Sequence, residues 1–174
     1  MKGLFMGKWI CEVPLDEWLE VATKIQSSAM SSKPTLRDNI FSSLQFIDEE
    51  IETSKQQKAF CLMADNQKEQ VKIAWASVYY LSPTVLRLRG LYVEPAYRQQ
   101  GQMSFLLKEI FNLYSKKAKK ALSFSTPKGL EFHKKFGFTQ VENFIPRPVA
   151  FYDFKTGTYS VDAGEIITLF EHSL

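Results

Sequence analysis

One stretch near the middle of the chain constrains the fold more than any other: an apolar strand that runs through a polar turn into an amphipathic helix. The strand ends at Leu91-Tyr92-Val93, the turn contains Arg98, and the helix opens at about Gly101. A helix N-terminus presents free backbone N–H groups and the positive end of the helix dipole, so such a turn is a ready site for phosphate. Arg98 adds a permanent cation, and Gly101 lets the backbone come close to a ligand because it has no Cβ. The stretch therefore predicts a pyrophosphate site.

Hydrophobic periodicity surrounds this stretch with both strands and helices. We expect strands over residues 8–13, 58–64, 71–81, 85–93, 121–125, 139–144, 149–154 and 165–170. We expect helices over residues 14–25, 35–51, 101–114 and 127–137, with a polar loop over 26–33. The short connections between residues 58 and 93 permit only an antiparallel meander. The strand–helix–strand passage from 85 to 125 implies a parallel pair with a right-handed crossover.

The size and charge of the chain narrow the class of protein. Its 174 residues suit a single domain over 1–174, and no apolar run is long enough to span a bilayer. The N-terminal residues lack the apolar core of a signal peptide, so we expect a cytoplasmic protein with no membrane partner. The net charge of +3 is mild, and basic and aromatic residues do not interleave as in single-strand binders. We therefore expect no nucleic-acid partner.

The cysteines and histidines do not indicate a metal centre. Cys11 and Cys61 are far apart in sequence, each within an apolar run, which favours two buried, reduced thiols over a disulfide or a nucleophile. With only His133 and His172 besides, no metal-ligand spacing recurs. We expect no metal site.

The strand–turn–helix stretch resembles the acyl-CoA signature of the GNAT superfamily of N-acyltransferases, which reads Arg/Gln-x-x-Gly-x-Gly/Ala after a strand with a Leu-Tyr-Val-like end. Leu91, Tyr92, Val93, Arg98 and Gly101 match this pattern. Met103 stands where the family usually has Gly or Ala.

A second segment resembles the family's downstream block, Asn-Pro-x-Ala-x-x-Phe-Tyr-x-Lys-x-Gly-Phe. Its matching residues are Pro127, Phe132, Lys135, Gly137 and Phe138. Thr126 replaces the usual Asn, Gly129 replaces Ala, and His133 replaces Tyr. The two blocks occur in the family's order, and the resemblance extends over roughly residues 57 to 144.

The resemblance implies an α+β fold, in which a mixed, mostly antiparallel sheet carries helices on both faces. It implies a cleft where the strand ending at Val93 and the strand ending near Ser125 splay apart, and this cleft holds the pantetheine arm as a pseudo-strand. The implied activity is acyl-CoA-dependent N-acyl transfer, with acetyl-CoA as co-substrate and a small-molecule or peptide amine as acceptor. A homodimer is one option. The residues implied to bind acetyl-CoA are Leu91, Tyr92, Val93, Arg98, Gln99, Gln100, Gly101, Gln102, Met103, Ser104 and Thr126.

The sequence matches the family's catalytic residues less well than its cofactor signature. His133 holds the position of the family's Tyr, which commonly protonates the leaving thiolate, and imidazole can donate a proton near neutral pH. The alternative is that His133 only packs at the helix edge. No general base is evident, because Arg87 stands where many relatives carry Glu.

Arg87 and Arg89 share one face of their strand, since they alternate with Leu86 and Leu88. They either line the acceptor cleft, where they favour an anionic or neutral amine, or form a solvated face. The missing base also keeps open a second function, a non-catalytic acyl-CoA-binding or interaction module. A dinucleotide oxidoreductase is disfavoured, because no Gly-x-Gly-x-x-Gly follows a strand.

Overall fold

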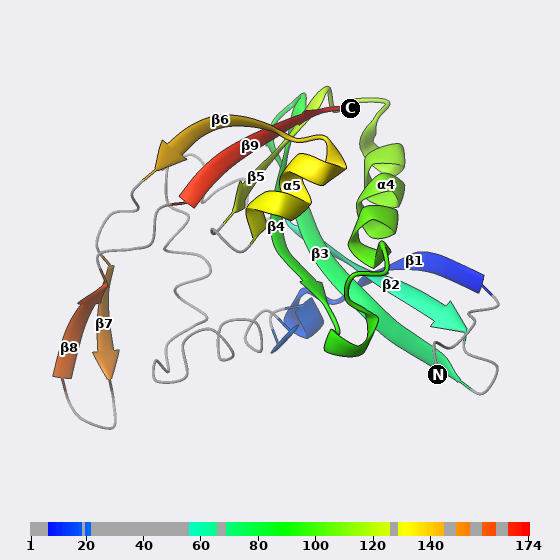
Figure 1. Ribbon diagram of the computed structural model, residues 1–174, viewed down its shortest axis with the longest axis horizontal. Coiled ribbons are helices and arrows are strands. Elements are labelled where there is room, and N and C mark those ends of the chain that lie inside the picture. Colours follow the sequence, from blue (N-terminus) through cyan, green and yellow to red (C-terminus); the bar gives the residue numbers. More distant parts are fainter. Residues whose placement is uncertain are drawn as a thin grey trace.

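The computed structural model describes residues 7–18, 20–21, 56–65, 69–125, 129–144, 149–153, 158–162 and 167–174. Its main feature is a seven-stranded sheet in the order β1-β2-β3-β4-β5-β9-β6 (Figure 1). These strands are β1 Gly7–Val13, β2 Lys58–Asp65, β3 Gln70–Ser82, β4 Val85–Val93, β5 Lys120–Ser125, β6 Thr139–Phe144 and β9 Ile167–Ser173. The β4–β5 pair is parallel and the other neighbouring pairs are antiparallel. A separate two-stranded sheet consists of β7 Val149–Asp153 and β8 Thr158–Asp162.

Most of the expected elements are confirmed. The meander of β2, β3 and β4 and the parallel β4–β5 pair are as predicted, and so is helix α4 Gln102–Tyr114. Helix α5 Leu130–Phe136 ends at Gly137, whose φ of 105° is left-handed. Strand β8 was not predicted, and the last strand lies a few residues later than expected. Residues 15–18 and 20–21 are helical, whereas the expected helix 35–51 and the loop 26–33 lie outside the described residues.

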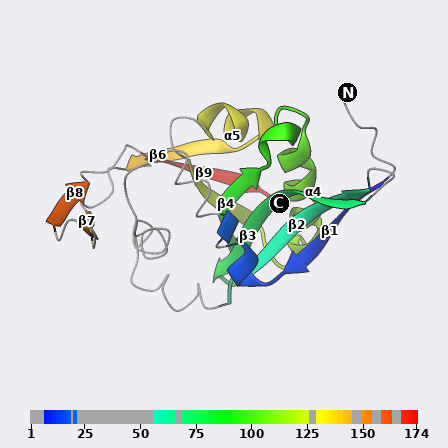
Figure 2. The ribbon, with the colours of Figure 1, turned by 90° about the horizontal axis from the view of Figure 1, so that it is seen from below.

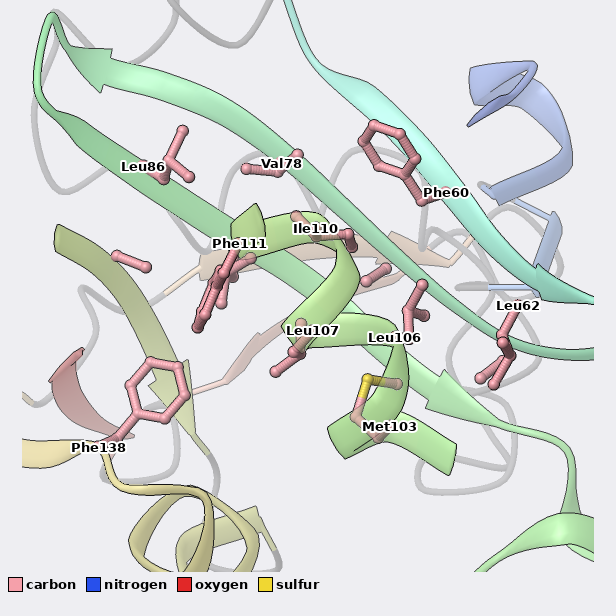
Figure 3. Packing of buried hydrophobic residues seen from close by; sticks show 14 of the residues in the cluster. Phe60, Leu62, Val78, Leu86, Met103, Leu106, Leu107, Ile110, Phe111 and Phe138 are labelled. Atoms are coloured by element: carbon pink, nitrogen blue, oxygen red, sulfur yellow. The ribbon is translucent and has the colours of Figure 1, made fainter. Parts of the chain in front are cut away.

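Helix α4 covers one face of the sheet because its apolar side chains recur at helical spacing. Leu106, Leu107 and Ile110 are fully buried on this face. Figure 3 shows them packed against side chains of β2, β3 and β4, with Met103 in the same cluster. Fully burying a Leu or Ile side chain contributes about 1.5–3 kcal/mol, so α4 is anchored by several such contacts. The first turn of α4, which follows the polar turn, is held in place by this packing.

A second cluster covers the opposite face of the sheet, where the helical residues 15–18 and 20–21 lie (Figure 2). Trp18 is fully buried there against Cys61 and Trp75. Cys11 and Cys61 are direct partners across β1 and β2, and both thiols are free. Burial raises the pKa of the Cys61 thiol to about 12, so this thiol is protonated and unreactive at neutral pH.

Strand β4 changes its pairing on both edges near Gly90. Toward β3 the register shifts, because Arg89 faces Ser77 while Tyr92 faces Trp75, so two residues of β4 oppose one of β3. Gly90 has a φ of 56° at this bulge, and its carbonyl accepts a hydrogen bond of 3.2 Å from the Trp18 indole N–H.

Toward β5, the pairing of β4 ends at Leu88, two residues before Gly90. The register runs from Val85 opposite Lys120 to Leu88 opposite Ser123. Beyond this pair, the described residues of β4 and β5 do not pair with each other. The expected splay of the two strands is therefore confirmed. None of the helices in the described ranges combines the length and apolar character needed to cross a membrane.

Replacing Gly90 by Ala tests how far the bulge depends on Gly. A Cβ at Gly90 would overlap the Trp18 ring, whereas a Cβ at Gly101, where φ is 72°, meets no atom within 4 Å. Left-handed strain costs about 1–2 kcal/mol at either site, and steric overlap adds about 1–3 kcal/mol at Gly90 alone. In urea denaturation, Gly90→Ala should lose at least about 2 kcal/mol and clearly more than the matched control Gly101→Ala. Equal losses would contradict this account.

Candidate functional site

A cavity of about 1070 Å³ opens where β4 and β5 part. The end of β4, from Leu88 to Val93, forms one wall, and Ser123 and Ser125 of β5 form another. The turn before α4 and one side of α5 complete the lining, including His133. The cavity thus joins the predicted phosphate turn to the predicted catalytic residue.

The turn between β4 and α4 has the backbone of an anion site. It begins with the 3₁₀ turn η1 Pro95–Tyr97 and contains Gln99 at a φ of 59° and Gly101 at a φ of 72°. Left-handed residues in a turn are typical of nests of backbone N–H groups that bind anions. Gly101 is the N-cap of α4 and provides no side chain to cap it, and the first turn carries no acidic residue. The free N–H groups and the dipole of α4 therefore remain available to a phosphate.

Arg98 links the turn to the end of β4 through one N–H group of its guanidinium. Its Nε donates to the Val93 carbonyl at 2.9 Å, and its guanidinium lies 5.6 Å from the centre of the Tyr92 ring. A guanidinium has five N–H donors, so the remaining ones can still contact a phosphate.

The cavity contains most of the residues that the sequence predicts to bind acetyl-CoA. Those that line it are Leu91, Tyr92, Val93, Arg98, Gln99, Gly101, Gln102, Met103 and Ser104. Gln100 is not among the lining residues, and its side chain donates instead to the Ala96 carbonyl at 3.1 Å. Thr126 lies outside the described residues. Met103, which departs from the family pattern, packs in the α4 core, where its side chain stabilises the helix.

Of the two alternatives for Arg87 and Arg89, the solvated face is wrong. Their exposed fractions are 2% and 5%. Packed side chains cover both faces of the sheet, so a charged side chain on the central strand β4 is buried whichever face it lies on. Arg89 lines the cavity, whereas the Nη1 of Arg87 donates to the Leu88 carbonyl at 2.6 Å.

His133 is held at the cavity wall by two hydrogen bonds and by aromatic rings. Its Nδ1 lies 2.9 Å from the Gly129 carbonyl oxygen, and its Nε2 lies 2.8 Å from the Ser123 hydroxyl oxygen. The imidazole stacks on Phe170 at 4.9 Å between ring centres, with the edge-on ring of Phe138 at 5.1 Å. Only 4% of His133 is exposed.

These contacts determine the protonation state of the resting imidazole. Burial lowers the pKa of His133 below the ordinary value of 6.5, and the hydrogen bond to Gly129 opposes this only in part. The ring is therefore neutral at neutral pH. A carbonyl oxygen only accepts hydrogen bonds, so the proton resides on Nδ1, and Nε2 accepts a hydrogen bond from Ser123.

The site also contains residues that we did not single out from the sequence, namely Ser123 and Ser125. Ser123 and Ser125 alternate along β5 and both are buried. Two serines at period 2, just before the Thr-Pro that opens the second family block, were the available signal. The contact of Ser123 with His133 of α5 could not be inferred without the fold.

The comparisons with known proteins agree with this geometry. A model of the acetyltransferase (GNAT) domain matches residues 57–140. A GNAT family acetyltransferase from Elizabethkingia anophelis, solved with acetyl-CoA bound, aligns with a TM-score of 0.56 and 14% identity over 97% of this chain and 99% of that one. The ribosomal-protein-S18-alanine N-acetyltransferase from Escherichia coli aligns with a TM-score of 0.58 and 14% identity over 96% and 94%.

A third structure, from Pyrococcus horikoshii, aligns with a TM-score of 0.54 and 16% identity over 82% of this chain, which spans only 47% of that protein. No curated protein sequence matches the chain. At these identities the solved structures establish the fold, and the domain model covers the elements from β2 to the start of β6 that build the cavity. The chain belongs to the GNAT superfamily.

The protonation state of His133 can be measured directly. We expect an NMR titration of ¹⁵N-labelled protein to give His133 a pKa below 6.5 with the proton on Nδ1, because the ring is buried and Gly129 only accepts. A His172→Phe variant assigns the signals, since the chain has 2 histidines. A pKa at or above 6.5, or a proton on Nε2 at neutral pH, would contradict this reading.

Proposed function

We propose that the protein is an acyl-CoA-dependent N-acyltransferase that moves an acetyl group from acetyl-CoA to a primary amine by direct attack. The observation that supports this most is that the anion turn, the parted strands and His133 face one cavity. Phosphate binding, thioester placement and proton transfer are then available within a single site.

The residues present suit each part of acetyl-CoA. The turn from Arg98 to Ser104 would hold the pyrophosphate through backbone N–H groups and the guanidinium. Beyond Leu88 and Ser123, β4 and β5 are no longer paired with each other, and the amides of a pantetheine arm can hydrogen-bond to their facing edges. That arm would run along the cavity toward His133.

The reaction needs an unprotonated amine, a polarised thioester carbonyl and a proton for the leaving thiolate. A backbone N–H near Val93, in the wall of the cavity, would polarise the carbonyl, as the family resemblance implies. His133 would hold the proton that the thiolate receives. Because the resting imidazole has no proton on Nε2, it must first gain one during the reaction.

The acceptor would be a small-molecule or peptide amine that is neutral or anionic. Arg89 lines the cavity with a permanent positive charge, and a like charge in a partly desolvated cleft costs more than at the surface. A peptide N-terminus fits this description, and the Escherichia coli neighbour is an alanine N-acetyltransferase of a ribosomal protein.

The second candidate is a non-catalytic acyl-CoA-binding module. It is favoured by Arg87, which is buried at the position where many relatives carry a glutamate base. The two candidates share the acetyl-CoA site and differ only in turnover.

Acetyl-CoA binding should depend on the absence of a side chain at residue 101. Gly101 faces open space within the turn, so Gly101→Phe should fill the place of the phosphate while the helix core stays intact. We expect the affinity for acetyl-CoA in calorimetry to fall tenfold or more, about 1.4 kcal/mol. Gly101→Ala has the same backbone strain with little bulk and should lose less. An unchanged affinity in Gly101→Phe would rule out this turn as the cofactor site.

Turnover should distinguish the two candidate functions. Thiol release from acetyl-CoA is followed with primary amines of different charge: a neutral amino-acid amide, an anionic amino acid, an alanine-terminated peptide and spermidine. We expect release with at least one neutral or anionic amine and slower release with spermidine, because Arg89 lines the cavity. Acetyl-CoA binding without release for any amine would favour the non-catalytic module, and spermidine as the best acceptor would contradict the proposed role of Arg89.

A further inference from the structure

Ser123 lies where the reacting thioester would lie if the proposed function is correct. It is the last residue of β5 in register with β4, opposite Leu88, and the two strands part immediately beyond it. Its side chain lines the cavity although only 2% of the residue is exposed. A buried hydroxyl at the point where the strands diverge is close to any ligand that fills the gap between them.

The hydrogen bonds around Ser123 have a defined direction. The Gly129 carbonyl holds the His133 proton on Nδ1, so the Ser123 hydroxyl must donate to Nε2. The oxygen of Ser123 keeps its lone pairs, while its proton points to a base. Ser123 can therefore accept a proton from a substrate as it passes its own proton to His133, which is the direction of a general base.

We propose that Ser123 and His133 form a proton relay that carries a proton from the attacking amine to the departing thiolate, with Ser123 as the catalytic residue that touches substrate. This inference rests on the proposed N-acyltransferase function. It supplies the general base that is absent at Arg87. It also lengthens the reach of His133, because imidazole is shorter than the phenol usual at this position in the family.

The steps balance without any further reactant. The amine nitrogen bonds to the thioester carbon and gives a proton to the Ser123 oxygen, while the Ser123 hydroxyl proton moves to His133 Nε2. As the C–S bond breaks, the sulfur keeps the electron pair and takes a proton from Ser123. The imidazolium returns its extra proton to Ser123, which leaves an amide, a thiol and a neutral His133.

The surroundings of His133 suit a brief imidazolium. Burial disfavours the charged ring at rest, and the Gly129 carbonyl stabilises it once it forms. The rings packed against it, Phe132, Phe138 and Phe170, carry no charge. The titratable side chains that line the same cavity are Arg89, Tyr92, Tyr97, Arg98, Glu131 and Lys135. In the described part of the chain, the polar contacts of the imidazole are Ser123 and Gly129.

The hydrogen bond is tested without catalysis. In ¹⁵N NMR, Ser123→Ala should shift the Nε2 signal of His133 toward that of a free acceptor nitrogen, because the donor is gone. The control Ser125→Ala removes a hydroxyl two residues along the same strand and should leave that signal in place. An unmoved Nε2 signal in Ser123→Ala would overturn the relay.

The relay itself is tested with acetyl-CoA and the best amine of the panel. We expect Ser123→Ala to lower kcat on the order of 100-fold, with acetyl-CoA affinity within about twofold. The acid limb of the kcat/KM profile, which reports His133 becoming neutral as pH rises, should vanish in Ser123→Ala and persist in Ser125→Ala. His133→Phe should be as slow, and the double variant no slower than either, because the two residues act as a unit.

The outcomes separate the relay from the function it rests on. If the parent turns over and Ser123→Ala keeps the same rate and the same acid limb, the relay is overturned and the N-acyltransferase function stands. The relay is also overturned if the rate of the double variant falls by the product of the two single-variant fold losses, because independent residues behave in this way. Ser123→Cys, which keeps a weaker donor, should recover part of the rate if the proton passes through residue 123. Acetyl-CoA binding by the parent with no turnover of any amine overturns the N-acyltransferase function, and with it the relay.

Discussion

The divergence of β4 from β5 after the Leu88–Ser123 pair is the constraint on which the rest of the site depends. Before that point the two strands hydrogen-bond as ordinary parallel neighbours. Beyond it, each exposes a facing edge of backbone donors and acceptors that needs a partner. The Gly90 bulge lies at this place, and Trp18 holds it from the opposite face of the sheet. The cavity between the strands is thus a consequence of how β4 is packed on both of its faces.

Burial of polar groups gives this cavity its chemistry. His133, Ser123 and Gly129 satisfy one another inside a shell of aromatic rings, so the imidazole is neutral and has one tautomer. The turn before α4, which also lines the cavity, is exposed and presents backbone N–H groups and Arg98. The cavity therefore has exposed residues and Arg98 at the turn before α4 and buried polar groups at His133.

Local patterns in the chain predicted the elements well where one physical rule dominated. Alternation and short turns predicted the β2–β3–β4 meander, and the apolar stripe of α4 predicted its buried face. Strand β8 was missed although Tyr159 and Val161 alternate with polar residues, because two apolar residues within five are a short signal. Arg87 and Arg89 were misjudged as a possible solvated face, since charge suggests exposure and only the packed sheet shows that both are buried. Met103 departs from the family pattern at the signature, yet its side chain belongs to the core.

The sequence by itself determined the turn between β4 and α4, because a strand end, Gly101 and a helix start are local features that act through nearby backbone. It also predicted, by resemblance to the family, that His133 stands at the position of the proton donor. The tertiary structure alone decided what His133 can do there. Its proton location depends on Gly129 within its own helix segment and on Ser123 of β5, which comes beside it only when the strand and helix pack. Hydrogen bonds between distant segments, and the burial that strengthens them, arise only from the assembled fold.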